Sequence, residues 1–149
     1  MAKKTFKGRS LLSGNLTGKA LASKQPLNTT GSYLENLFGG NSESAPCTDP
    51  NNKAFYGKEL GGAIICTTTT VGSSLGGAAL MGVGSLGLGP KAILFSQHVD
   101  SVSLAGLLMD DIWNGRRVIT IDLLGDEFLD TVKSGDPIAI GEDGTVTVG

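Results

Sequence analysis

Residues 61–89 have the sequence GGAIICTTTTVGSSLGGAALMGVGSLGLG, and the rest of the chain is organised around this stretch. The apolar run at 63–66 predicts a buried strand. A polar turn follows at 67–72, and the small residues after Ser73 and Ser74 predict a helix. A strand, a turn and a helix N-terminus in succession form a common anion site, because free backbone N–H groups and the helix dipole point outward there. The sequence therefore predicts an anion site with two hydroxyl groups at its mouth.

The composition indicates one folded domain over residues 1–149 with part of its surface covered by a partner. Of the 149 residues, 40% are hydrophobic and 17% are charged, and 23 are glycine. A net charge of −2 gives no support for binding to nucleic acid or to an anionic membrane. The sequence contains no apolar segment long enough to span a membrane and no signal-peptide pattern, so the expected location is the cytoplasm.

The segments that follow predict a small parallel sheet. Buried strands are expected at 91–96 and 117–122, and residues 101–113 between them have helical spacing with Ser101 as N-cap. Strand, helix, strand, helix, strand at this spacing predicts right-handed crossovers. The apolar residues that fall broadly on one side of the helix are Val102, Leu104, Ala105, Leu108 and Ile112.

The two ends of the chain predict a second sheet. Short strands are expected at 6–12 and 19–22, and two more flank the turn Glu142-Asp143-Gly144, at 137–140 and 145–148. If this C-terminal hairpin pairs with the N-terminal strands, the fold is a three-layer β/β/α arrangement with helices on one face.

The long loop at 25–59 and the two cysteines give no metal-binding pattern. Phe55 and Tyr56 are expected to pack the loop onto the body of the domain. Cys66 lies in an apolar strand and is expected to be a buried structural thiol, whereas Cys47 lies in a polar part of the loop. Since no cysteine, histidine or carboxylate spacing matches a metal site, no metal is expected to be held by this chain alone.

Ser73 and Ser74 have two possible roles. Either serine could be an ordinary helix N-cap. Alternatively, one hydroxyl could be reactive, because positive potential at a helix N-terminus stabilises an alkoxide or a bound carboxylate. A hydrolase triad of Ser74, Asp122 and His98 is disfavoured, because these residues occur in the wrong chain order for the matching G-x-S-x-G fold. Arg116 and Arg117, after the helix, are either surface residues or carboxylate ligands.

The order of short motifs along the chain resembles the small subunit of the aconitase X family, from about residue 6 to the C-terminus. The motifs are Thr17-Gly18-Lys19-Ala20-Leu21, Gln25-Pro26-Leu27, Phe38-Gly39-Gly40, Asp49-Pro50, Tyr56-Gly57-Lys58, Leu60-Gly61-Gly62, Gly72-Ser73-Ser74, Ser134-Gly135-Asp136 and Glu142-Asp143-Gly144-Thr145-Val146.

This resemblance implies a swivelling domain that closes over an iron–sulfur cluster held by a larger aconitase-like subunit. It also implies dehydration of a hydroxy acid, either cis-3-hydroxy-L-proline or mevalonate 5-phosphate. Ser73 would be the proton acceptor in that reaction. The residues expected to bind substrate beside it are Gly72, Ser74, Gly39 and Gly40.

The sequence departs from the family pattern at two places. Leu75 stands where aconitase has an arginine that binds substrate carboxylate, and the loop at 41–48 lacks an expected Gly-Val-Asp-Pro segment. An apolar residue after the two serines suits a compact ring-shaped substrate, which favours the hydroxyproline. Two other hypotheses stay open: a non-catalytic module that only caps a partner's site, and a stand-alone serine hydrolase.

Overall fold

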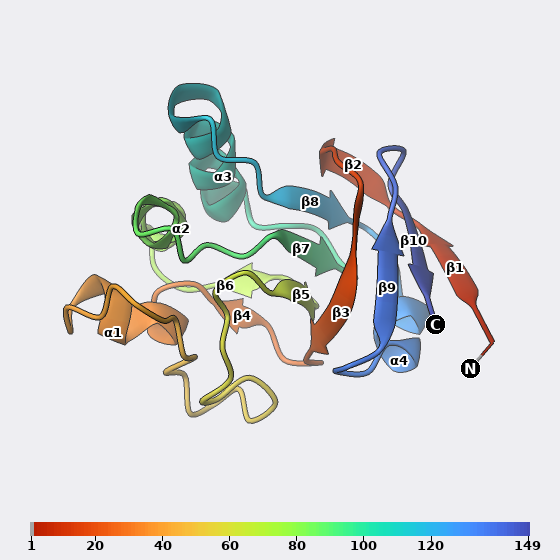
Figure 1. Ribbon diagram of the computed structural model, residues 1–149, viewed down its shortest axis with the longest axis horizontal. Helices are drawn as coiled ribbons and strands as arrows, with labels where there is room; N and C mark the ends of the chain where they lie inside the picture. Colours follow the sequence, from red (N-terminus) through yellow and green to blue (C-terminus); the bar gives the residue numbers. More distant parts are fainter. Residues whose placement is uncertain (1) are drawn as a thin grey trace.

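The structure, a computed structural model, describes residues 2–149 and has three layers (Figure 1). The strands are β1 (Lys4–Lys7), β2 (Arg9–Leu12), β3 (Leu16–Ala22), β4 (Leu27–Asn28), β5 (Ile64–Thr67), β6 (Thr70–Val71), β7 (Ala92–Phe95), β8 (Ile119–Asp122), β9 (Pro137–Ile140) and β10 (Thr145–Val148). The helices are η1 (Gly31–Tyr33), α1 (Leu34–Leu37), α2 (Gly76–Ser85), α3 (Ser101–Asn114) and α4 (Asp126–Thr131).

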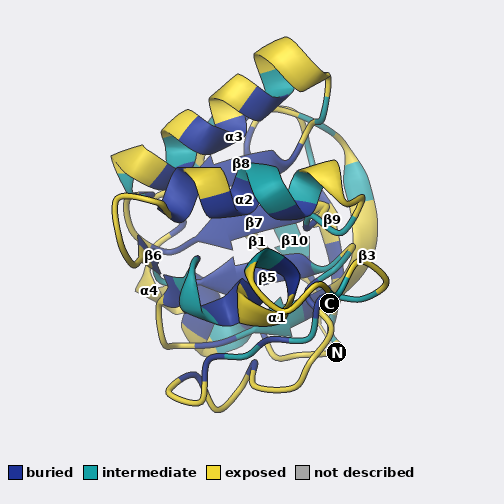
Figure 2. Cartoon of the chain, turned by 90° about the vertical axis from the view of Figure 1, so that its left-hand side faces the viewer, coloured by how far each residue is buried: buried dark blue, intermediate teal, exposed yellow. Residues whose placement is uncertain are grey.

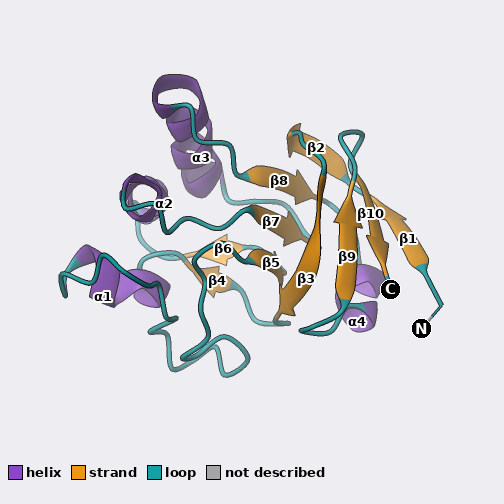
Figure 3. Cartoon of the chain, in the orientation of Figure 1, coloured by secondary structure: helices purple, strands orange, loops and turns teal. Residues whose placement is uncertain are grey.

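One continuous sheet forms two of the three layers, in the strand order β1-β10-β9-β3-β5-β7-β8-β2. Strands β3, β5, β7 and β8 are parallel, whereas β9, β10 and β1 are antiparallel and fold over them (Figure 3). Strand β3 joins the layers, because its first half pairs with β9 and its second half with β5. The predicted β/β/α fold with a C-terminal hairpin is confirmed. The helices do not all lie on one face as predicted, because α4 packs in the core between the sheet layers, opposite α2 and α3.

The N-terminal strand expected at 6–12 is two strands in different layers. Strand β1 pairs with β10 and β2 pairs with β8, and the chain crosses between the layers at Gly8. A Cβ atom at Gly8 would lie 2.6 Å from the carbonyl oxygen of Asp122, so the crossing needs a residue without a side chain. The sequence predicted a single strand here and did not show this break.

Two apolar cores lie on the two faces of the parallel strands. Residues of β5 and β7 alternate between them: Ile65 and Ile93 face helices α2 and α3, whereas Cys66 and Leu94 face β9, β10 and α4. Because both faces are covered, these strands are continuously apolar, as the sequence indicated. Figure 2 shows α2 and α3 lying over the buried strands, with their outer surfaces exposed.

Helices α2 and α3 cross with their backbones in close contact. A Cβ atom at Gly106 of α3 would lie 2.5 Å from the Cα atom of Gly77 in α2. The inward face of α3 is accordingly made of small or polar side chains together with Leu107. Of the residues predicted on the apolar side of this helix, Leu104 packs partly buried against the core, whereas Val102, Leu108 and Ile112 are exposed, so that side is not the core face. The exposed apolar residues of α3 are Val102, Leu108, Met109, Ile112 and Trp113.

Helix α3 is capped by Asp100 and not by Ser101, the predicted N-cap. The Asp100 carboxylate accepts hydrogen bonds from the backbone N–H groups of Val102 and Ser103. Ser101 is the first helical residue. In the part of the chain that the structure describes, no helix is long and apolar enough to cross a membrane.

The C-terminal hairpin carries an acid-sensitive contact. Hydrogen bonds from Thr145, followed by the Lys7 ammonium 3.1 Å away, lower the pKa of Asp143 to about 2. A carboxyl group with a lowered pKa in the folded state stabilises the fold above its unfolded pKa of about 4 and loses this effect as the pH falls towards 2.

We therefore expect acid unfolding of the wild-type chain to steepen between about pH 4 and pH 2, and Asp143→Asn to remove that part of the pH dependence. The measurement is denaturant unfolding at a series of pH values. The same pH dependence in wild type and variant would contradict the assignment.

Candidate functional site

The candidate site is built on a two-stranded parallel sheet formed by β4 and β6. Asn28 is the partner of Val71 in this pairing, so the chain leaves both strands at the same edge. Thr29 and Thr30 follow β4, and Gly72 and Ser73 follow β6. The hydroxyl groups of Thr30 and Ser73 are 3.5 Å apart. The sequence predicted only a turn at 67–72, because strands of two residues carry too little pattern to be recognised.

Gly72 allows the chain to turn sharply at this edge. Its φ angle is +132°, in a region that residues with side chains rarely adopt. A Cβ atom here would also lie 3.1 Å from Oδ1 of Asn28. The glycine therefore brings the Asn28 side chain directly beside the backbone that leads into Ser73. That Oδ1 atom accepts a hydrogen bond of 2.8 Å from the N–H of Gly31.

Ser73 organises the turn before α2 but is not the helix N-cap. Helix α2 begins at Gly76, and the preceding Leu75 makes no side-chain cap bond. The hydroxyl of Ser73 accepts a hydrogen bond of 3.1 Å from the N–H of Leu75, and its carbonyl accepts one of 3.0 Å from Gly76. Ser73, which the sequence offered as a possible N-cap, therefore lies two residues before the N-cap position and caps the turn instead of the helix.

The two serines present unused donors to solvent. Both are exposed. Within residues 2–149, neither the backbone N–H groups of Ser73 and Ser74 nor the Ser74 hydroxyl makes a hydrogen bond. These groups lie just before the N-terminus of the ten-residue helix α2, where the dipole favours negative charge. The arrangement can receive a carboxylate without an arginine.

An apolar groove lies next to the turn that carries Ser73, because Thr30 and Leu75 line it. It has a volume of about 180 Å³ and is lined by Thr30, Leu37, Phe38, Leu75, Ala78 and Ala79. Phe38 and Leu75 are 74% and 60% exposed, which is unusual for large apolar side chains. Gly39 and Gly40 directly follow Phe38 at the end of α1. They follow a residue that lines the groove, but they do not line it themselves.

A polar pocket lies near the ends of β4 and β6. It has a volume of about 280 Å³ and is lined by Gln25, Pro26, Asn28, Asp49, Asn51, Asn52 and Val71. Asn28 and Val71 connect it to the turn at Gly72. Neither the pocket nor the groove is lined by a lysine, an arginine or a histidine. Residues next to Ser73 in the chain or in space therefore line an apolar groove (Thr30 and Leu75) and a polar pocket (Val71), although Ser73 itself lines neither.

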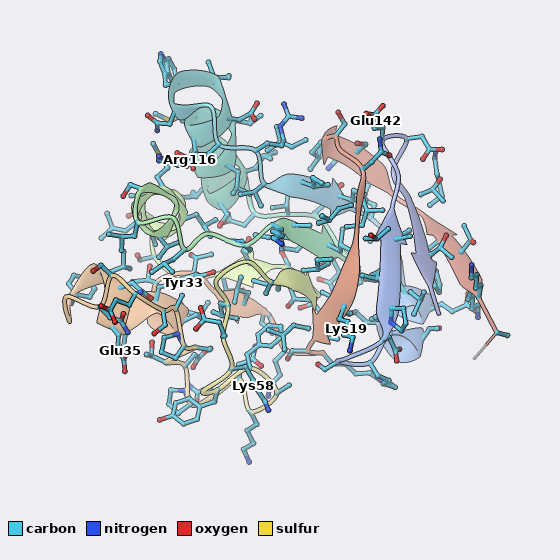
Figure 4. The ribbon with its side chains drawn as sticks, viewed as in Figure 1. Lys19, Tyr33, Glu35, Lys58, Arg116 and Glu142 are labelled. Carbon is cyan, nitrogen blue, oxygen red and sulfur yellow. The ribbon has the colours of Figure 1, made fainter. Side chains whose placement is uncertain are left out.

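The long loop packs more tightly than its sequence suggests. Phe55 is fully buried as predicted, but Tyr56 is 57% exposed. Cys47, expected in a polar environment, is buried in the core beneath α1 and α2 together with Tyr33, which is labelled in Figure 4. Burial, and secondarily the charge of a Cys47 thiolate, raises the pKa of Tyr33.

The residues of this chain do not fit an iron–sulfur cluster. Cys66 is completely buried as predicted, and burial raises the pKa of its thiol, which disfavours the thiolate that a metal needs. Cys47 is 2% exposed. The described residues contain no group of three or more histidine, cysteine, aspartate or glutamate side chains placed to bind a metal.

Asp122, the acidic member of the disfavoured triad, is already paired with an arginine. Arg9 contacts the buried carboxylate of Asp122 through Nε at 2.9 Å and through Nη2 at 2.7 Å. The Nδ1 atom of His98 is 4.0 Å from Asp122 but has no recorded contact with Ser74, so the triad is not assembled.

Arg116 and Arg117 are also held by carboxylates. Arg116, labelled beside α2 and α3 in Figure 4, contacts the buried Asp110. Arg117 contacts Asp111, and hydrogen bonding to the guanidinium lowers the pKa of that carboxyl group. Neither arginine is available as a free carboxylate ligand.

Comparisons with known proteins agree with this architecture. Residues 5–148 match the sequence model of the aconitase X swivel domain. The fold superposes on aconitase X from Thermococcus kodakaraensis in its holo-form, with a TM-score of 0.80, 20% identity and 98% of each chain covered. A UPF0107 protein solved in solution by NMR has a TM-score of 0.73 at 20% identity, over 96% of this chain and 97% of that one. No curated protein sequence matches. The chain belongs to the aconitase X swivel-domain family.

Proposed function

We propose that this chain is the small subunit of an aconitase X-type hydro-lyase and that Ser73 accepts the proton α to the substrate carboxylate. The observation that carries the proposal is the exposed Ser73 hydroxyl beside two unused backbone N–H groups at the start of α2. Membership of the family supports a dehydratase completed by a larger subunit.

The residues of this chain supply binding and proton transfer. The N–H groups of Ser73 and Ser74 bind the carboxylate. Ser73 first releases its hydroxyl proton to solvent, and the resulting alkoxide, which the positive potential at the helix N-terminus stabilises, receives the α-proton and becomes a hydroxyl again. The side-chain amide of Asn28 makes no hydrogen bond through Nδ2 among the described residues, so it is a third donor within the same turn. The leaving hydroxyl needs an electrophile, which the large subunit supplies through its iron–sulfur cluster.

The surroundings of Ser73 favour cis-3-hydroxy-L-proline as the substrate. Phosphate recognition relies on arginine, lysine or helix N-termini. Here the helix N-terminus is the carboxylate site, and no basic residue lines the groove or the pocket. The exposed Leu75 and the adjoining groove suit the methylene groups of a small ring. Mevalonate 5-phosphate would require that the large subunit bind the phosphate.

The test is to co-express this chain with a larger aconitase-like subunit and assay both substrates. We expect dehydration of cis-3-hydroxy-L-proline by the complex and none by either chain alone. A large subunit that is fully active alone would contradict the proposal. A complex that requires this chain but tolerates the double change Ser73→Ala and Ser74→Ala would show a non-catalytic cap instead.

A further inference from the structure

Among residues 2–149, Thr30 is the only residue whose side chain lies within hydrogen-bonding reach of the Ser73 hydroxyl. Its Oγ1 atom is 3.5 Å from Oγ of Ser73, and either oxygen can be the donor. The other hydrogen bond to that hydroxyl comes from the backbone N–H of Leu75, at 3.1 Å. Oγ of Ser73 therefore has one backbone donor and one hydroxyl neighbour, which comes from a segment 43 residues away in the chain.

The Thr30 hydroxyl has no role in its own segment. Thr30 occupies the N-cap position of η1, where a threonine side chain commonly accepts a hydrogen bond from the backbone, but it makes no such bond here. The nearby N–H of Gly31 donates to Oδ1 of Asn28 instead, at 2.8 Å. Within the described part of the chain, the only contact of the Thr30 hydroxyl is the one with Ser73. Local structure thus leaves this hydroxyl free to serve Ser73.

The backbone is fixed on both sides of Thr30. Before it, the N–H of Thr29 donates a hydrogen bond of 3.1 Å to the carbonyl of Val71, which continues the pairing of β4 with β6. After it, the carbonyl of Gly31 accepts a hydrogen bond of 2.6 Å from the Thr48 hydroxyl. Thr30 is therefore held against the turn that carries the reactive serine before any substrate arrives. A donor that stabilises a developing charge needs this preorganisation.

We propose that Thr30 is a positioning residue for the proton acceptor and that its hydroxyl donates a hydrogen bond to the Ser73 alkoxide, a role that rests on the proposed function. The proton that Ser73 loses goes to solvent and Thr30 keeps its own. The Thr30 O–H and the Leu75 N–H then converge on the negative oxygen. Hydrogen bonds to a charged oxygen are shorter, at about 2.7 Å, and roughly twice as strong as those between neutral groups, so the contact favours the alkoxide over the hydroxyl.

The test compares two substitutions of Thr30 in the assembled complex, with cis-3-hydroxy-L-proline as substrate. Thr30→Val removes the hydroxyl but keeps the shape of the side chain and its contribution to the apolar groove. We expect kcat to fall about 10- to 100-fold, the effect of one hydrogen bond to a charged oxygen. KM should stay nearly unchanged, because Thr30 acts through Ser73 and not on the substrate. Thr30→Ser restores the hydroxyl and should recover most of the turnover.

Thr29→Val is the matched control, because it makes the same exchange at the neighbouring position. Thr29 is 0% exposed, and its hydroxyl has no hydrogen-bond partner among residues 2–149. Removing a buried hydroxyl that makes no hydrogen bond is nearly neutral or stabilising, so kcat and KM should match those of the wild type. A loss of kcat in Thr29→Val as large as in Thr30→Val would show that the segment tolerates neither change and would overturn the proposal.

The double variant shows whether Thr30 acts through Ser73. Adding Thr30→Val to Ser73→Ala should lower kcat no further, because the alkoxide that Thr30 stabilises is already absent. A further loss as large as in the single variant, or a Thr30→Ser complex as slow as Thr30→Val, would overturn the proposal. Normal turnover in Thr30→Val with lost turnover in Ser73→Ala would overturn it and leave the proposed function standing. A wild-type complex that dehydrates nothing would refute the proposed function, and the role of Thr30 with it.

Discussion

Ser73→Ala in the assembled complex should lower kcat by about 10²- to 10⁴-fold, the range expected when a positioned proton acceptor is removed. KM should change little, because the carboxylate is bound by backbone N–H groups that the substitution leaves in place. The measurement is steady-state dehydration of cis-3-hydroxy-L-proline at matched complex concentration and matched iron content.

Ser74→Ala is the control for this prediction. The two serines are adjacent and exposed, but the Ser74 hydroxyl makes no hydrogen bond among residues 2–149, whereas that of Ser73 accepts one from Leu75. We expect Ser74→Ala to keep most of the turnover. Equal losses in the two variants would show that the turn tolerates neither change and would remove the special role of Ser73.

Gly106→Ala should destabilise the chain by about 3 kcal/mol, at the upper end of the range for overpacking. The new methyl group would lie 2.5 Å from the Cα atom of Gly77, so the backbones of α2 and α3 must move apart. The better helix propensity of alanine offsets about 1 kcal/mol of the strain and is already included in this figure. For a chain of this size the midpoint of thermal unfolding should fall by about 6–12 °C.

Gly82→Ala is the matched control, because Gly82 is also a helical glycine in α2. A methyl group there would meet only the flexible end of Leu37, at 3.2 Å. We expect a stability close to that of the wild type, or slightly higher from helix propensity. The measurement is the midpoint of thermal unfolding of both variants, compared with that of the wild type. A Gly106→Ala chain as stable as Gly82→Ala would contradict the close helix crossing.

The main strands could be predicted because their sequences are constrained locally. Strands β5 and β7 are short, mainly apolar runs since both of their faces are buried. Strand β8 is equally buried, but its isoleucines alternate with Thr120 and Asp122. The hairpin of β9 and β10 follows from the turn at Asp143 and Gly144. The order of these elements along the chain was sufficient to predict the β/β/α fold.

The buried face of α3 could not be predicted from hydrophobicity. At this crossing the helices approach so closely that Gly106 and Ser103 occupy the interface, and the larger apolar residues are left outside. Shape complementarity between two backbones decides the contact. A pattern of apolar spacing has no information about the size of the gap that the residues must fill.

The candidate site could be predicted in part. Gly72 and Ser73 were found because they follow a strand and precede a helix, which is a local signal. Asn28 and Thr30 were missed as site residues, because the β4–β6 pairing brings them there from a distant part of the sequence. A threonine in a polar loop carries no sign of the hydroxyl that it will meet across that pairing.

The most direct measurement is the fate of the α-deuterium in a single turnover of cis-3-hydroxy-L-proline deuterated at that carbon. The wild-type complex and the Ser73→Ala complex, with equal iron content, are each mixed in excess with the deuterated substrate. The loss of deuterium is then followed by mass spectrometry. If Ser73 is the proton acceptor, the variant binds the substrate but loses the deuterium at least about 100-fold more slowly. Loss of the deuterium at the wild-type rate would contradict the account.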